Sequence, residues 1–211
     1  MKGILSLLKM KTRGDKPRDE HTDSVLFSTA FAGQGVDDSM LVPWEARAVE
    51  VGAKRLPTSR GGKLLQGLWA KDKYMAHLDK DAVERMERFF EFAAVASNRD
   101  VIRQDEYGNF MVVLLTGSIA VDRVQPWGEQ LRLAETRPGD MLGEMSLLDS
   151  GIRFSACTTL TDCEVAVLSA DAMDDMMDKD PQLAASLVAL LARKLSLRLR
   201  VVSARLSENQ K

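Results

Sequence analysis

The sequence is poor in several residues on which common protein chemistries depend. Its 211 residues include two cysteines, Cys157 and Cys163, and two histidines, His21 and His77. Two cysteines are too few for a disulfide framework, and no zinc-ligand pattern surrounds them, which is typical of a reducing compartment such as the cytoplasm. We therefore expect a cytoplasmic protein without a metal site, whose cysteines pack as small core residues. Metal or redox sensing through them is the alternative.

Long apolar runs are also absent. No stretch of about 18 apolar residues occurs, which excludes a transmembrane helix. The N-terminus carries Ile4, Leu5, Leu7 and Leu8, but a serine and a lysine interrupt this run and no small-residue cleavage site follows, which argues against a secretory signal. We expect a terminus that is frayed or docked on its own protein, and the alternative is a basic amphipathic helix that touches a membrane or a partner.

The two histidines carry no sign of a catalytic centre. His21 lies in an irregular N-terminal stretch and His77 in the first helical region, and no Ser, Cys or Asp signature of nucleophilic catalysis accompanies either. We expect both to be surface residues. The sequence thus predicts a protein that is not an enzyme, with no catalytic residues and no cofactor.

What the sequence does contain is an ordinary globular composition with an uneven distribution of charge. Hydrophobic residues make up 45% and charged residues 28%, and the length suits one domain with appendages. The formal net charge of −2 hides a contrast, because residues 101–180 carry 6 Lys/Arg and 15 Asp/Glu, whereas residues 181–211 carry 6 and 1. A basic tail of this kind indicates nucleic acid, a membrane surface, or a helix that lies on an acidic body.

The first part of the chain is predicted to be an N-terminal extension, residues 1–60, that is partly irregular. Residues 39–55 are apolar enough to pack on the main body as a short helix or strand. From Leu64 the periodicity becomes helical. One helix would bury Leu64, Leu65, Leu68 and Trp69, and a second, capped by Asp79 or Asp81, would bury Val83, Met86, Phe89, Phe90 and Ala93.

Between Val101 and Leu168 the pattern changes to short strands separated by turns. The candidate strands are 101–102, 110–115, 118–124, 130–136, 154–160 and 163–168. Strands this short and this regularly spaced are typical of an antiparallel sandwich or jelly-roll barrel. A short acidic helix is predicted over 170–179, followed by a long one over 181–206, about 39 Å in length, that Pro181 starts.

The long C-terminal helix carries two neighbouring apolar stripes. A helix that only covers a barrel needs one stripe, so the wider surface suggests two partners. One would be the barrel of the same chain, and the other a second copy of the chain in a parallel, coiled-coil-like dimer. Burial of a single broad face in one core is the alternative. The stripes are Val188, Leu191, Leu195, Leu199, Val202 and Leu206, and Leu187, Leu190, Leu197 and Val201.

The most informative segment is residues 137–156. A turn, Pro138-Gly139-Asp140, leads into Gly143-Glu144, about one helical turn follows, and Arg153 begins the next strand. A glycine before a short helix lets a ligand approach the backbone, and the exposed amides favour an anion. An arginine can add a bidentate contact to a phosphate, while a carboxylate can accept a hydrogen bond from a sugar hydroxyl. Taken alone, the pattern also fits a surface Glu–Arg ion pair.

This segment resembles the phosphate-binding cassette of the cyclic nucleotide-binding domain family. The family pattern is Gly-Glu, a short helix, and Arg nine residues after the Glu, here Gly143, Glu144 and Arg153. Residues 102–104, Gly108 and residues 110–117 resemble the first strands of the family, and Pro138-Gly139-Asp140 resembles the entry to its cassette. The resemblance covers about residues 64–205, so we predict that residues 61–211 form the domain.

The resemblance implies an eight-stranded antiparallel jelly-roll barrel, or double-stranded β-helix, with flanking helices. It also implies a 3′,5′-cyclic nucleotide, cyclic AMP or cyclic GMP, as the ligand. Arg153 would neutralise the phosphate, Glu144 would hold the ribose 2′-hydroxyl, and the Gly143 backbone would face the sugar-phosphate. The remaining candidate ligand-binding residues are Met145, Ser146, Phe154 and Ser155, and the candidates for covering the base are Leu195, Leu199 and Val202.

The sequence departs from the family pattern at three places. Two glycines that the family usually has fall near Arg99 and Asp105, so those turns must be built differently. The residue after the arginine is often small, whereas here it is Phe154, which either points into the barrel or narrows the pocket. For this reason a barrel that keeps its shape as a ligand-free dimerisation or protein-interaction module is the alternative function.

The helix 181–206 determines what such a module can transmit. The sequence ends at Lys211, without the residues of a helix-turn-helix domain, so we expect no sequence-specific DNA binding. Instead, the ligand would favour one arrangement of the helix, which an unknown partner protein would recognise. The other possibility is nonspecific nucleic-acid binding by basic residues of this helix. A simple solvated helix face explains the same residues and is favoured, because no aromatic residues are interleaved with them. Nucleic-acid binding would use Arg193, Lys194, Arg198, Arg200 and Arg205.

Overall fold

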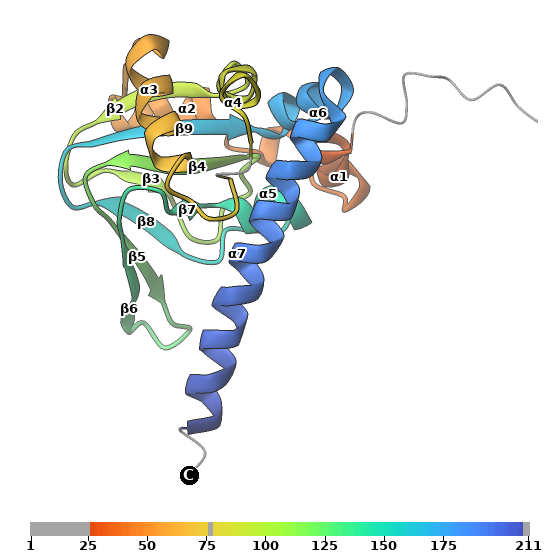
Figure 1. Cartoon of the computed structure of the whole chain (residues 1–211). Helices are drawn as coiled ribbons and strands as arrows, with labels where there is room; N and C mark the ends of the chain where they lie inside the picture. Colours follow the sequence, from red (N-terminus) through yellow and green to blue (C-terminus); the bar gives the residue numbers. More distant parts are fainter. Residues whose placement is uncertain (1–25, 76–77, 209–211) are drawn as a thin grey trace, which may run out of the picture.

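The computed structural model describes residues 26–75 and 78–208, and its strands form two antiparallel sheets (Figure 1). The expectations for residues 1–13, His21 and His77 lie outside these ranges. The strands are β1 (Lys54–Arg55), β2 (Glu91–Val95), β3 (Asp100–Ile102), β4 (Phe110–Thr116), β5 (Ile119–Val124), β6 (Gln130–Thr136), β7 (Met141–Leu142), β8 (Ala156–Thr159) and β9 (Cys163–Ser169).

The order of the strands is that of a jelly roll. One sheet runs β1-β2-β9-β4-β7 and the other runs β3-β8-β5-β6. Strands β2 to β9 are therefore divided between two facing sheets, with the neighbours β5 and β6 in the same sheet, and β1 is added at the edge of the first. The predicted antiparallel β fold with flanking helices and a long C-terminal helix is confirmed.

The helices lie before, within and after the two sheets. They are α1 (Phe27–Gly33), α2 (Trp44–Val51), α3 (Thr58–Trp69), α4 (Lys80–Glu87), α5 (Glu144–Asp149), α6 (Ala170–Lys179) and α7 (Pro181–Glu208), with a 3-10 turn, η1 (Asp38–Met40). The bounds predicted for α6 are those observed, and α7 extends two residues beyond its predicted end.

The predicted second helix was wrong at its C-terminal end. We expected its apolar face to continue to Ala93, but α4 ends at Glu87 and the chain turns into β2. This strand pairs with β9 in regular register, from Glu91 opposite Val167 to Val95 opposite Cys163. Since most of β2 is buried, its residues show no alternation of polar and apolar side chains, and the pattern could not be distinguished from the end of a helix.

Residues 26–60 pack on the barrel. Trp44 of α2 is 3% exposed, and its ring lies edge-on to Phe110 with centroids 5.6 Å apart. Strand β1 pairs with β2, and Val42 donates a backbone hydrogen bond to the Tyr107 carbonyl. The division of the chain at residue 60 stays a prediction, but the residues before it contribute to the core.

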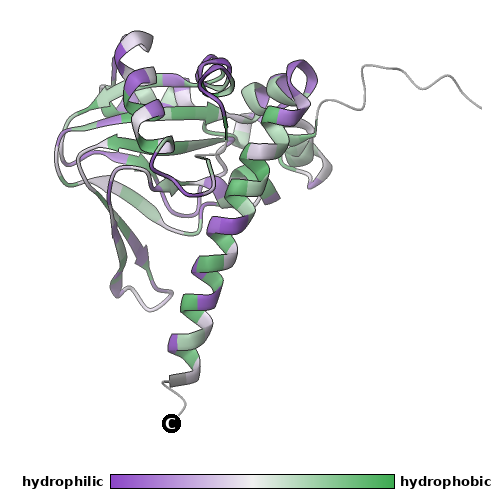
Figure 2. Ribbon diagram, viewed as in Figure 1, coloured by the Kyte–Doolittle hydropathy of each residue, from purple (hydrophilic) through white to green (hydrophobic). Residues whose placement is uncertain are grey.

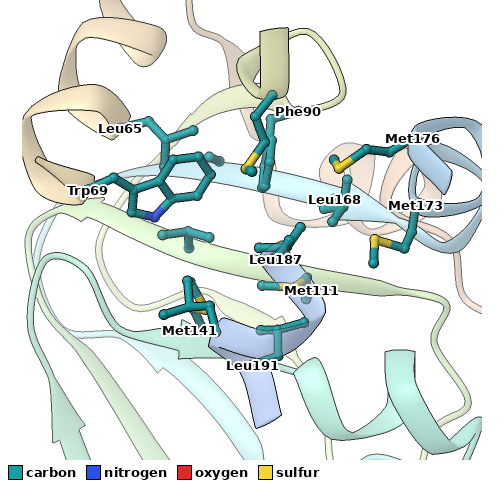
Figure 3. Close-up of a cluster of buried hydrophobic side chains, with 14 of the residues drawn as sticks. Leu65, Trp69, Phe90, Met111, Met141, Leu168, Met173, Met176, Leu187 and Leu191 are labelled. Carbon is teal, nitrogen blue, oxygen red and sulfur yellow. The ribbon is translucent and has the colours of Figure 1, made fainter. Parts of the chain in front are cut away.

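Two clusters of buried side chains hold these elements together. One lies inside the jelly roll and includes Trp44, Phe110 and both cysteines. Both cysteines are free and buried in this cluster, so their predicted role as small core residues is confirmed. Burial also raises the pKa of the Cys157 thiol to about 12. The other cluster joins the first sheet to helices α3, α4, α6 and α7, and is rich in methionine (Figure 3). It includes Met75, Met86, Met111, Met141, Met173 and Met176.

Helix α7 divides into two halves. Its first half buries Leu183, Leu187, Leu190 and Leu191 against the barrel. Its second half continues past the body of the molecule (Figure 1) and is hydrophobic in part (Figure 2). Leu199, Val202 and Leu206 are 67%, 51% and 60% exposed. In the described part of the chain, no helix is long and apolar enough to cross a lipid bilayer.

Candidate functional site

The cassette contains the predicted turn, short helix and returning strand, but the prediction that Arg153 begins the strand was wrong, because β8 starts at Ala156 and Arg153 lies in the loop before it. Asp140 closes the entry turn by accepting a hydrogen bond from the Arg137 amide (3.0 Å). Gly143 then adopts a left-handed backbone, φ 75°, which a glycine accommodates without steric penalty. Helix α5 follows, and β8 begins at Ala156. The geometry therefore places Glu144 and Arg153 on either side of Gly143.

Arg153 is buried, with a relative exposure of 3%. Its guanidinium donates hydrogen bonds to the carbonyls of Gly143 (2.7 Å) and Phe110 (2.6 Å), and it lies 4.7 Å from the centre of the Phe110 ring. No carboxylate of the described residues forms an ion pair with it. Burial therefore lowers the pKa of Arg153 to about 10, which means that the fold holds this positive charge at an energetic cost.

Two glycines make room for this arginine. A Cβ atom at Gly143 would lie 2.5 Å from Nη1 of Arg153, and one at Gly108 would lie 2.7 Å from Nη2. We expected Gly143 to admit a ligand to the backbone, but in this structure the protein's own guanidinium occupies the space beside it. Gly108, which we noted only as part of the family resemblance, has the same role on the opposite side.

Glu144 is the second buried charge of the cassette, at 4% exposure. Its carboxylate forms an ion pair with Arg198 of α7, and Arg198 also donates a hydrogen bond to the Met141 carbonyl (2.8 Å). Burial raises the pKa of Glu144, while Arg198 and then Arg153 oppose that rise. The group expected to hold a ribose hydroxyl is thus paired with the C-terminal helix.

Cations anchor the middle of α7 to the body. Lys194 contacts Asp72 (3.2 Å) and donates to the Gly139 carbonyl (3.2 Å), and Arg193 lies 5.3 Å from the centre of the Tyr74 ring. With Arg198, three of the five basic residues considered for nucleic-acid binding therefore contact the protein itself.

Sequence reasoning missed the role of Arg198. A usable signal was present, because Arg198 lies three residues after Leu195 and four before Val202 and so shares a helix face with them. A cation beside Leu195, which we expected to cover a ligand in the cassette, could have suggested a carboxylate of the cassette as its partner.

The other predicted cassette residues differ in how far they are exposed to solvent. Ser146 is buried, Ser155 is half-buried, and Met145 is 46% exposed. Phe154 is 51% exposed, so it does not fill the barrel. The guanidinium of Arg123, from β5, lies 4.1 Å from the centre of the Phe154 ring and donates a hydrogen bond to the Phe154 carbonyl. Of the two alternatives for Phe154, the core position is wrong.

The three residues predicted to cover a base lie along α7, near and beyond the ion pair. Leu195 is half-buried, whereas Leu199 and Val202 are 67% and 51% exposed. The turns without the family's glycines use other residues, since Asn98 and Asp105 adopt left-handed backbones with φ of 59° and 65°. Asn and Asp tolerate this conformation better than most side chains.

A jelly roll with a Gly-Glu…Arg cassette and a following long helix defines a class of ligand-binding domain, and the comparison with known families agrees. Residues 94–180 match the family model of the cyclic nucleotide-binding domain. The resemblance to this family is therefore confirmed for that part of the chain.

Similar proteins include transcription regulators and isolated domains. The chain is 30% identical to the CRP-like cAMP-activated global transcriptional regulator of Mycobacterium tuberculosis. The identity holds over 95 aligned residues, which are 45% of this chain and 42% of the relative. The chain is also 29% identical over 107 residues to the Cyclic AMP receptor protein of Thermus thermophilus, and these residues are 51% of this chain and 50% of that protein. The chain thus spans about half the length of the curated relatives it matches.

Solved structures show the same fold. A cyclic nucleotide-binding domain from Methylobacillus flagellatus superposes with a TM-score of 0.67 at 21% identity, covering 72% of this chain and 86% of that one. The catabolite activator protein of Thermus thermophilus superposes with a TM-score of 0.54 at 27% identity, covering 63% of each chain.

Proposed function

We propose that this protein is a regulatory module that binds a 3′,5′-cyclic nucleotide, cyclic AMP or cyclic GMP, and transmits binding through α7 to a partner protein. The observation that carries the proposal is the ion pair between Glu144 of the cassette and Arg198 of α7. It joins the group that would hold the ligand directly to the element that would move. The match of residues 94–180 to the family, and relatives whose names describe cAMP-activated regulators, support this ligand class.

The phosphate would bind at the start of α5. Arg153 is held there with carbonyls as its hydrogen-bond partners, and a buried cation without a counter-ion is a functional-site signal. Phosphate oxygens accept stronger, charge-assisted hydrogen bonds than carbonyl oxygens do. The ligand would therefore supply a negative charge in direct contact with Arg153, which no carboxylate of the described residues does.

The ribose would compete with α7. Arg198 pairs with Oε1 of Glu144, and a 2′-hydroxyl that donates to the same oxygen would compete with it. Ligand binding therefore weakens the contact that holds the middle of α7, and the helix shifts towards a released arrangement. By linkage, a partner that binds the released helix raises the affinity for the nucleotide.

Calorimetric titration with cyclic AMP, cyclic GMP and the 2′-deoxy analogue of the tighter ligand tests this assignment. We expect wild type to bind the 2′-deoxy analogue at least tenfold more weakly than the parent nucleotide, since its Glu144 would lose a hydrogen bond to a charged group. In Glu144→Ala the two ligands should bind alike. Glu135→Ala, an exposed residue of β6, is the matched control and should behave as wild type.

Absence of heat and of any thermal shift with either cyclic nucleotide would overturn the proposal. That result would favour the second candidate, a ligand-free interaction module. One observation supports this alternative, because both charged groups of the cassette already have protein partners, Arg198 for Glu144 and two carbonyls for Arg153.

A further inference from the structure

Asp174 of α6 holds the first turn of α1 from a distant part of the chain. One of its carboxylate oxygens accepts hydrogen bonds from the amides of Leu26 and Phe27, and the other accepts one from the amide of Ser28, each at 2.8 Å. The carboxylate is 7% exposed. These amides lack partners within their own helix, so α1 depends on α6 for the start of its structure.

The far end of α1 reaches the cassette. Gln34, which follows α1, donates a hydrogen bond from its side-chain amide to the Asp149 carbonyl at the last residue of α5 (2.6 Å). Between these two attachments, Phe27 and Phe31 are 7% and 1% exposed. Helix α1 therefore packs against both α6 and α5 through an apolar face that has a polar contact at each end.

Together these contacts close a ring of four helices. Helix α5 is attached to α1 at its C-terminal end through Gln34, and to α7 at its N-terminal end through Glu144 and Arg198. Helix α1 is attached to α6 through Asp174, and one residue, Asp180, separates α6 from α7. Figure 1 shows α1, α5 and α6 gathered around the upper half of α7.

We propose that α1 is a clamp that fixes the α6–α7 arm to the cassette helix, and that displacing α1 releases α7. Each attachment limits the motion of the others, because a shift of the whole α6–α7 arm away from Glu144 must also move α6 relative to α1 and α5. A change at residues 26–34 would therefore reach the cassette without any contact to the ligand.

Hydrogen exchange on the unliganded full chain tests the clamp without reference to a ligand. In Asp174→Ala, we expect amides of residues 27–36 to lose at least tenfold protection, and amides of α5 and of residues 190–200 in α7 to lose protection with them. Asp178→Ala, an exposed carboxylate of the same helix, is the matched control and should leave all of these segments unchanged.

Gln34→Ala provides a second variant, because it removes only the link to α5 from an exposed side chain. It should loosen α5 and α7 while residues 27–30 keep their protection. Loss of protection confined to α1 in both variants would overturn the clamp.

The effect on ligand affinity rests on the proposed function and has its own readout. If the clamp keeps α7 on Glu144, Gln34→Ala and Asp174→Ala should each bind cyclic AMP or cyclic GMP several-fold more tightly than wild type. Unchanged affinity in a protein that binds nucleotide would contradict coupling to the cassette. If wild type binds no cyclic nucleotide, the proposed function fails, and the exchange experiment alone decides whether the clamp exists.

Discussion

At the scale of single residues, the cassette shows how a short motif can be recognised while its internal contacts stay hidden. The spacing of Gly143, Glu144 and Arg153 predicted where the chain would bring them together, and it does so. The sequence did not predict that the Arg153 side chain would pack against Gly108 and donate hydrogen bonds to backbone carbonyls. Side-chain direction within a barrel depends on contacts between strands far apart in sequence, which spacing alone does not contain.

Gly108→Ala tests this account of Arg153. The added methyl group would lie 2.7 Å from a guanidinium that two hydrogen bonds hold in place, so Arg153 must shift. We expect the free energy of unfolding, from urea denaturation, to fall by about 1–3 kcal/mol. Gly67→Ala is the control, because Gly67 lies in α3 with nothing within 4 Å of its added Cβ. It should gain up to about 1 kcal/mol from helix propensity, whereas unchanged stability of Gly108→Ala would contradict the tight packing.

At the scale of elements, two opposing effects act on Glu144, the residue that joins α5 to α7: burial disfavours its charge, and the ion pair with Arg198 favours it. Burial is the larger influence on Glu144 and raises its pKa, although Arg198 opposes it. A group whose pKa is raised by folding stabilises the fold when protonated, and this contribution is lost as the pH rises through the raised value. The ion pair therefore fixes the position of α7 relative to α5, but it contributes little to the stability of the protein.

Glu144→Gln follows from that balance. The neutral amide avoids the cost of a buried charge, so the variant should be more stable than wild type at pH 7. The difference should shrink as the pH falls towards the ordinary glutamate pKa of about 4.3. Urea denaturation at pH 4 and pH 7 measures it, with Glu135→Gln on the exposed strand β6 as the control. A variant less stable than wild type at pH 7 would mean that pairing with Arg198 outweighs burial.

The predictability of each element depended on how clearly the sequence marks its boundaries. The strands from β4 to β6 were found nearly to the residue, since glycines and polar turns separate them. Strand β2 was missed because it is mostly buried and follows α4 without a glycine or proline to mark the boundary. The two-residue strands β1 and β7 are too short to give a pattern, and pairing with neighbours defines them.

At the scale of the whole molecule, the apolar residues of α7 beyond Arg198 are exposed in the described structure. Leu195, Leu199, Val202 and Leu206 follow one another at intervals of four, three and four residues, the spacing of a coiled-coil seam. The last three are between 51% and 67% exposed. Such a stripe fits the second partner that we expected for this helix, another copy of the chain in a parallel dimer. This dimer stays a proposal.

Light scattering coupled to size-exclusion chromatography tests the dimer. Wild type should have twice the 23.4 kDa mass of one chain, and Leu199→Glu combined with Leu206→Glu should have the mass of a single chain, because the charges would oppose each other across the seam. Ala204→Glu adds a charge at an exposed position on the face of α7 opposite the seam and should leave the dimer intact. A wild-type protein that elutes with the mass of one chain at all accessible concentrations would rule the seam out.

The position of Asp174 also has a consequence for the time at which the protein can finish folding. The amides that it holds are 146–148 residues earlier in the chain. During synthesis the N-terminal residues emerge first, so α1 must wait for almost the whole chain before its first turn is complete. Contacts of such long separation slow folding, because the loop between them must close before they form. Helix α1, the first of the described helices, is therefore expected to be among the last elements to reach its final structure.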